Sequence, residues 1–95
     1  MRMMMKITIP FEAANKAMRD GTAQQIIGTQ LAALRPEAAY FFPADDGRMI
    51  LLFIDLKDPS DMPAIGEPWF QGLSARITFT PVMNPEDFKT GLAKK

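Results

Sequence analysis

Polar side chains that could bind an oxygen-bearing ligand alternate with apolar ones in two β-like segments. Lys6 and Thr8 belong to MMMKITI, and Arg76 and Thr78 belong to ARITFTPV. Successive side chains of a strand point to opposite faces, so these four residues share one face if the segments are neighbouring strands. Lys and Arg beside hydroxyls favour an anionic or carbonyl oxygen, through charge-assisted hydrogen bonds. The pattern predicts substrate binding by Lys6 and Arg76, with Asp55 as a carboxylate partner. Alternatively, Asp55 only pairs with one of them at the rim of an interface.

Two further residues could transfer a proton, and two aromatic residues could form the wall of the same site. Tyr40, the only tyrosine, joins a polar tip to an apolar body. Glu67 precedes Pro68 in a segment suited to the lip of a pocket, and it is the best candidate for a general base. Trp69 and Phe70 follow directly and would supply the apolar wall. The alternatives are a buried Tyr40 bonded to a backbone carbonyl, a Glu67 that only supplies charge near a helix start, and a Trp69 in the core.

The composition excludes several classes of site. The 95 residues contain no cysteine and no histidine, so disulfides, thiolate zinc, a cysteine nucleophile and an imidazole base are impossible. We therefore expect neither a metal nor a cofactor. Eleven Lys and Arg balance eleven Asp and Glu without forming blocks, which argues against nucleic acid or an anionic membrane as partner. No apolar run approaches the length of a membrane span, so we expect a soluble, cytoplasmic protein.

Four segments have the composition and the periodicity of β-strands, and they form the frame for these side chains. They are residues 3–9, 38–42, 48–56 and 75–82. The second and third are joined by PADDG, whose Pro, Asp and Gly are typical of a hairpin turn.

The intervening segments favour helices. Gly21, followed by the capping-box pattern Thr22-x-x-Gln25, predicts a break between helices at 11–19 and 23–34. Prolines at 63 and 68 predict one or two short helical turns within residues 60–73 instead of a long helix. Asn84, Pro85 and two acids then predict a short last helix that ends near Leu92.

The order of these elements is β-α-β-β-α-β with a short helix after it. It predicts one α+β domain over residues 1–95, with a ferredoxin-like antiparallel sheet and its helices on one face. The third strand, RMILLFIDL, is apolar on both faces, so the face opposite the helices also needs a cover. We expect a sheet-to-sheet homodimer. The alternative cover is the segment from Pro85 to Lys95, folded back over the sheet.

The order of elements resembles that of the dimeric α+β barrel superfamily. PEAAYF at 36–41, EPWF at 67–70 and PVMNPEDF at 81–88 are also similar to what is expected in a group of small uncharacterised bacterial proteins of that superfamily. The resemblance implies a ligand in a cleft between the sheet and its helices. Several branches depend on histidine, namely histidine-ligated haem and the His/Asp pair of YCII-like proteins, and this chain departs from them.

These observations together predict a homodimer that binds a small organic ligand. Arg76, Lys6 and Tyr40 would hold its polar end, and Trp69 and Phe70 would form the wall. Any enzyme activity would need no cofactor and would use Glu67 or Tyr40 for proton transfer. The hypothesis from another class is an interaction or scaffold homodimer that has no pocket.

Overall fold

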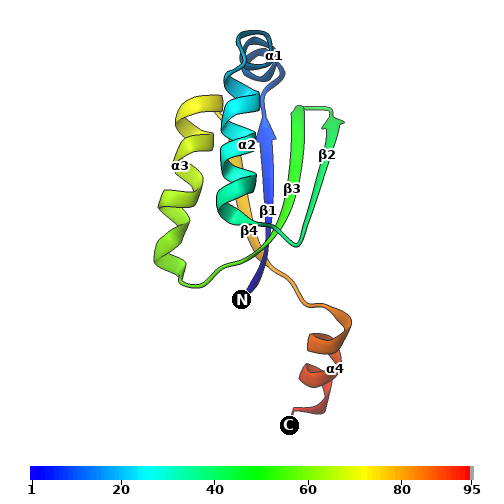
Figure 1. The fold of residues 1–95 in the computed structure, drawn as a ribbon. Helices are drawn as coiled ribbons and strands as arrows, with labels where there is room; N and C mark the ends of the chain where they lie inside the picture. Colours follow the sequence, from blue (N-terminus) through cyan, green and yellow to red (C-terminus); the bar gives the residue numbers. More distant parts are fainter. Residues whose placement is uncertain (95) are drawn as a thin grey trace.

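The computed structural model describes residues 1–94, which form an α+β fold with one antiparallel sheet (Figure 1). In chain order the elements are β1 (Arg2–Ile9), α1 (Phe11–Asp20), α2 (Thr22–Leu34), β2 (Ala38–Ala44), β3 (Gly47–Asp55), the 3-10 helix η1 (Pro59–Asp61), α3 (Met62–Leu73), β4 (Arg76–Pro81) and α4 (Pro85–Ala93). The four strands lie in the order β2-β3-β1-β4, and each neighbouring pair is antiparallel. All four predicted strands are confirmed to within two residues at each end.

The register of the sheet divides each strand into two faces. Lys6 of β1 lies opposite Leu51 of β3 and opposite Thr78 of β4, so these three side chains belong to one face. Met5 and Leu52, one position along, belong to the other face. Helices α2 and α3 cover that second face (Figure 1). We call the first, uncovered side the open face.

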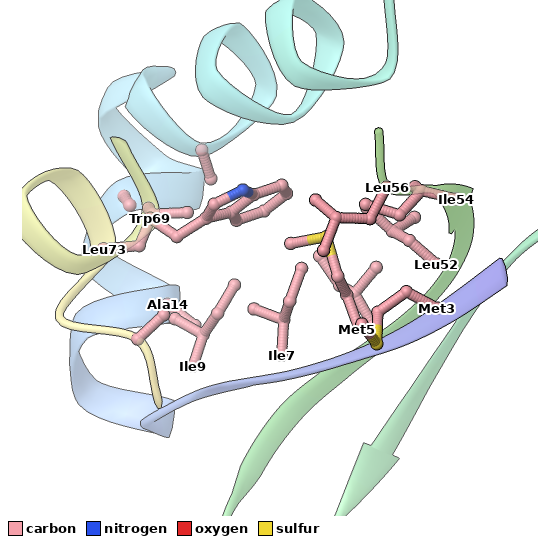
Figure 2. Packing of buried hydrophobic residues seen from close by; sticks show 14 residues of the cluster. Met3, Met5, Ile7, Ile9, Ala14, Leu52, Ile54, Leu56, Trp69 and Leu73 are labelled. Atoms are coloured by element: carbon pink, nitrogen blue, oxygen red, sulfur yellow. The ribbon is translucent and has the colours of Figure 1, made fainter. Parts of the chain in front are cut away.

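The hydrophobic core lies between the sheet and its helices, and Trp69 of α3 is at its centre (Figure 2). The largest fully buried side chains come from both layers: Trp69, Met5, Ile7, Leu52 and Leu73. Burying side chains of this size contributes about 1.5–3 kcal/mol each, which is the main stabilisation available to a chain of this length.

The break between α1 and α2 is where it was predicted, but its capping differs. Gly21 has φ 84°, a left-handed conformation that glycine adopts without steric penalty, and it ends α1. The predicted capping box of Thr22 and Gln25 is wrong, because Thr22 is already the first residue of α2. The side chain of Asp20 instead accepts a hydrogen bond of 2.9 Å from the Thr22 backbone N–H.

The prediction of short helical turns around Pro68 is also wrong. Helix α3 runs from Met62 to Leu73 with Pro68 inside it. Proline removes one backbone hydrogen bond and costs a helix about 3 kcal/mol. The burial of Trp69 and Leu73 on the inner side of α3 offsets this cost. At Gly72 a Cβ atom would come within 2.3 Å of the Ile26 side chain, so glycine permits the close approach of α3 to α2.

Helix α4 projects from the end of β4 and leaves the open face uncovered (Figure 1). None of its residues is buried. The Cα radius of gyration is 14.9 Å, against about 12 Å for a compact chain of this length. The alternative in which the segment 85–95 folds back over the sheet is therefore wrong for the described part of that segment; residue 95 lies outside the described residues. No helix within residues 1–94 has both the length and the apolar character needed to cross a bilayer.

Candidate functional site

An apolar cleft of about 510 Å³ lies between helices α1 and α2 on one side and strands β2 and β3 on the other. We call it the α1/β2 cleft. Its lining is mostly aliphatic and aromatic: Ile9, Phe11, Ala14, Asn15, Met18, Ala23, Ile27, Phe41, Phe42, Pro43, Arg48, Met49 and Ile50. Ligand pockets for small organic molecules span about 300–1,000 Å³ and have linings of this kind.

The cleft exists because β2 is an edge strand that the helices do not reach. Helix α2 runs over the centre of the sheet, and the helix-facing side of β2 is left bare (Figure 1). Phe41 faces this side, because it lies opposite the buried Ile50 of β3, and it remains 55% exposed. Met18 and Ile27 are only partly buried against the core. Apolar side chains of the helices and of the strands therefore line the cleft from opposite sides.

One polar pair lies in the lining of the cleft. The Arg48 Nη2 atom donates a hydrogen bond of 3.0 Å to Asn15 Oδ1, which joins the start of β3 to α1. The neighbouring Gly47 lies close to the end of β1, since a Cβ there would lie 2.3 Å from the Ile9 carbonyl oxygen. The guanidinium of Arg48 has further N–H groups. Arg48 can thus present a positive charge and free donors to an anionic or carbonyl oxygen in the cleft.

The predicted polar patch does form, but on the open face. Thr8 lies opposite Arg76, and Lys6 lies opposite Thr78, on the neighbouring strands β1 and β4. Arg76 makes an ion pair of 2.9 Å with Asp46 of the hairpin turn. The lining of the α1/β2 cleft includes Phe41 and Ile50 from the helix-facing side and Phe42 and Met49 from the open face. Lys6 and Arg76 are not among the residues that line it.

Asp55 does not join this patch. It ends β3 opposite Arg2. It accepts a hydrogen bond from the Lys57 ammonium group and another, of 2.8 Å, from the Met1 amino group. These two cations lower the pKa of Asp55 to about 2, with Lys57 as the larger cause. The carboxylate of Asp55 is thus bound by Lys57 and by the Met1 amino group, and not by Lys6 or Arg76.

The two residues predicted to transfer a proton lie apart from each other and from the cleft. Tyr40 projects from the open face of the edge strand β2, is 59% exposed, and packs edge-to-face on Phe53 with ring centroids 6.4 Å apart. Glu67 lies on the exposed side of α3 and accepts a hydrogen bond of 3.1 Å from Gln71. The helices and Tyr40 lie on opposite sides of the sheet, so Tyr40 and Glu67 do not form one acid-base pair.

The predicted aromatic wall is divided as well. Trp69 is fully buried in the core and does not line the α1/β2 cleft. Its indole Nε1 is buried without a hydrogen-bond partner. Phe70 is 38% exposed, and its ring lies over Gly66, where a Cβ would come within 2.8 Å of it.

The cleft residues Asn15, Phe41 and Arg48 were not found by sequence reasoning. A usable sequence signal existed for Phe41. Successive side chains of a strand alternate between the two faces, so Phe41 lies on the face opposite that of its neighbour Tyr40. Nothing local connects Asn15 with Arg48, which are 33 positions apart and meet only through the packing of α1 on β3. Within residues 1–94, no group of three or more acidic side chains could hold a metal ion.

Comparison of the chain with protein-family models, curated proteins and solved structures finds no match.

Proposed function

We propose that the protein binds a small, mainly apolar organic molecule with an anionic or carbonyl oxygen at one end, in the α1/β2 cleft. The observation that carries the proposal is the composition of the cleft: about 510 Å³ of space lined by apolar side chains and by one Arg-Asn pair. Apolar walls supply affinity through burial, and a single charged group supplies orientation. The polar end of the ligand is assigned to Arg48 in place of Arg76, Lys6 and Tyr40.

The residues of the cleft favour binding over catalysis. Among the described lining residues there is no carboxylate, lysine or tyrosine that could serve as general base or acid. The Arg48 guanidinium offers N–H donors to an anion but has no acceptor atom that could take a proton. The proposed role is thus capture of the ligand, without proton transfer by Glu67 or Tyr40.

The binding experiment uses 8-anilinonaphthalene-1-sulfonate, which has an aromatic body and an anionic sulfonate, followed by displacement with decanoate and with decanol. We expect decanoate to displace the dye more strongly than the neutral decanol of equal chain length. Arg48→Leu should weaken decanoate binding about tenfold, the usual effect of one charge-assisted hydrogen bond, and leave decanol unchanged. Arg19→Leu is the matched control, since Arg19 is an exposed residue of α1 that does not line the cleft.

A second variant tests whether the dye occupies the cleft or the open face. Ile27→Trp adds bulk to the cleft lining and should abolish displaceable binding, with the fold checked by far-UV circular dichroism. Unchanged dye binding in a folded Ile27→Trp protein would refute the assignment of the ligand to the α1/β2 cleft.

We further propose that the protein is a ferredoxin-like homodimer whose two open faces pack on each other, as in the dimeric α+β barrel superfamily. The support is that Leu51 and Phe53 of β3 and Met4 of β1 are apolar, lie on the open face, and have no helix over them. At about 25 cal/mol per Å², burial of such side chains would stabilise association by several kcal/mol. The scaffold hypothesis shares this dimer but predicts no ligand.

Light scattering over a wide dilution range tests the dimer. We expect a dimer for the wild type, and a monomer of unchanged circular dichroism for Leu51→Glu, since a carboxylate would be buried in the interface. A matched Thr78→Glu variant, on the polar side of the same face, should dissociate less. A wild-type monomer at all concentrations would refute the dimer. It would not affect the assignment of the ligand to the α1/β2 cleft, which the dye experiment tests separately.

A further inference from the structure

We infer that the segment from Val82 to Lys94, which we call the arm, packs on a second copy of this chain and is part of its dimer interface. The inference rests on the proposed dimer and adds an element to it. Its basis is a helix that projects from the domain (Figure 1) and carries exposed apolar side chains. Among residues 1–94, nothing covers these side chains.

The arm has an apolar side that faces solvent. Phe88 and Leu92 are 53% and 71% exposed, and Met83 just before the helix is 68% exposed. Residues four apart lie on the same face of a helix, so Phe88 and Leu92 form one apolar stripe. Thr90 and Ala93 lie on the opposite side. The amphipathic pattern is that of a helix which packs through one face.

A helix of this length does not persist alone in water. Helix α4 has nine residues and includes Gly91, whereas isolated helices shorter than about 12–15 residues are marginal even for favourable sequences. Its start is well specified: Asn84 and Asp87 form a reciprocal capping box, with a bond of 2.7 Å from the Asp87 N–H to the Asn84 side chain. Such caps define where the helix begins, but tertiary packing must stabilise the rest.

The base of the arm is bonded to the start of β1, and these contacts favour the position in which the arm projects away from its own sheet. The Val82 N–H donates a hydrogen bond of 3.2 Å to the Arg2 carbonyl oxygen. The Arg2 guanidinium lies 3.1 Å from Asp87 and also pairs with Glu37, whose hydrogen bond is the main cause that raises the pKa of Arg2. Arg2 thus links the first turn of α4 to the start of β1 and to the residue before β2.

A second copy is the occupant that the surface areas favour. Four strands at about 4.8 Å spacing and six residues at about 3.3 Å give the open face a footprint of roughly 400 Å². Standard stable interfaces bury about 800 Å² on each partner. The open face is also half polar, because its β1/β4 side carries Lys6, Thr78 and Arg76. The two arms of a two-fold dimer would supply the additional apolar contact, each on one partner surface.

The test measures dissociation constants of the full chain by sedimentation and light scattering. The arm variant Phe88→Glu/Leu92→Glu places two carboxylates on the apolar stripe, and Thr90→Glu/Ala93→Glu places the same charge on the opposite side. We expect the arm variant to raise the dimer dissociation constant about 30-fold or more, and the control to change it about threefold or less. Hydrogen exchange should show protection of the α4 amides in the wild-type dimer, which disappears on dilution to monomer.

The outcomes separate the arm from the dimer. If Leu51→Glu dissociates the dimer while the arm variant behaves like its control, the arm inference is overturned and the sheet-to-sheet dimer remains. If wild-type protein is monomeric at every concentration, both are overturned. Protection of α4 that does not change with concentration would also overturn the inference, because the cover would then belong to the same chain.

Discussion

The two faces of the sheet carry comparable side chains along β3, but among the described residues helices cover only one of these faces. Leu52 faces the helices and is fully buried, whereas its neighbour Leu51 faces the open side and is only half-buried. On β1, Met5 is fully buried and Met4 is not. Hydrophobic burial depends on what covers a side chain, so equal residues on the two faces should have unequal effects on folding and on association.

The largest effect is expected at the centre of the covered face. Trp69→Ala should lower the free energy of unfolding by about 3–5 kcal/mol, because it removes the largest fully buried side chain and leaves a cavity. Trp69→Phe should cost less, since it keeps most of the volume and removes an indole N–H that has no partner. Urea unfolding followed by circular dichroism measures this without the single tryptophan.

Phe70→Ala is the control for this prediction. Its ring lies on the outer side of α3 and is 38% exposed, so the expected loss is about 1 kcal/mol. Equal losses for Trp69→Ala and Phe70→Ala would contradict the position of the core between α3 and the sheet.

The direct comparison of the two faces uses neighbouring leucines. Leu52→Ala should cost about 2–4 kcal/mol of unfolding free energy, and Leu51→Ala under about 1 kcal/mol at concentrations where the protein is monomeric. At high concentration, Leu51→Ala should cost more, because it then also weakens the proposed dimer. If the two variants lost equal stability at high dilution, the open face would have a cover within the monomer.

The smallest effect is expected at the end of the open face, where Asp55 contacts the Lys57 ammonium and the Met1 amino group. These contacts lower the pKa of Asp55 from 3.8 to about 2, so the folded state binds its proton more weakly than the unfolded chain does. The resulting stabilisation is complete above about pH 4 and is lost as the pH falls towards 2.

Asp55→Asn should therefore reduce the slope of stability against pH between about 4 and 2, as measured by urea titrations at fixed pH. The effect should be modest, because Asp55 is exposed and solvent screens its partners. Lys57→Met serves as the matched variant and should remove only part of the slope, since the Met1 amino group remains. An unchanged slope in Asp55→Asn would contradict the pairing.

The strands were predictable because their signal is local. The alternation in MMMKITI and ARITFTPV, the two-sided apolar run in RMILLFIDL and the turn residues of PADDG are each read within a few positions. The open-face patch of Lys6, Thr8, Arg76 and Thr78 was predicted in the same way, once β1 and β4 were taken as neighbours. The separation of this patch from the α1/β2 cleft was not predicted, because it depends on how α1 and α2 pack against β2 and β3.

The candidate site was poorly predicted because it depends on distances between layers. Sequence reasoning weighted Pro68 as a helix breaker, but the burial of Trp69 outweighs its local cost, and α3 continues to Leu73. Because α3 continues through Pro68, Trp69 lies in the core and not in the predicted wall of a pocket. The α1/β2 cleft arises where α2 does not reach the edge strand β2, and no residue type marks such a gap.

By itself, the sequence determined the class of the fold and the apolar character of both faces along β3. Side-chain alternation and the absence of a polar face along β3 depend only on the order of residues and on the geometry of a strand. The tertiary structure decided which face the helices cover, where they leave an apolar cleft, and that α4 projects away from the sheet instead of folding over it. These outcomes depend on the packing of distant segments and on the anchoring of α4 by Arg2. Contacts of this kind have no local sequence signal, because they form only when the whole chain is folded.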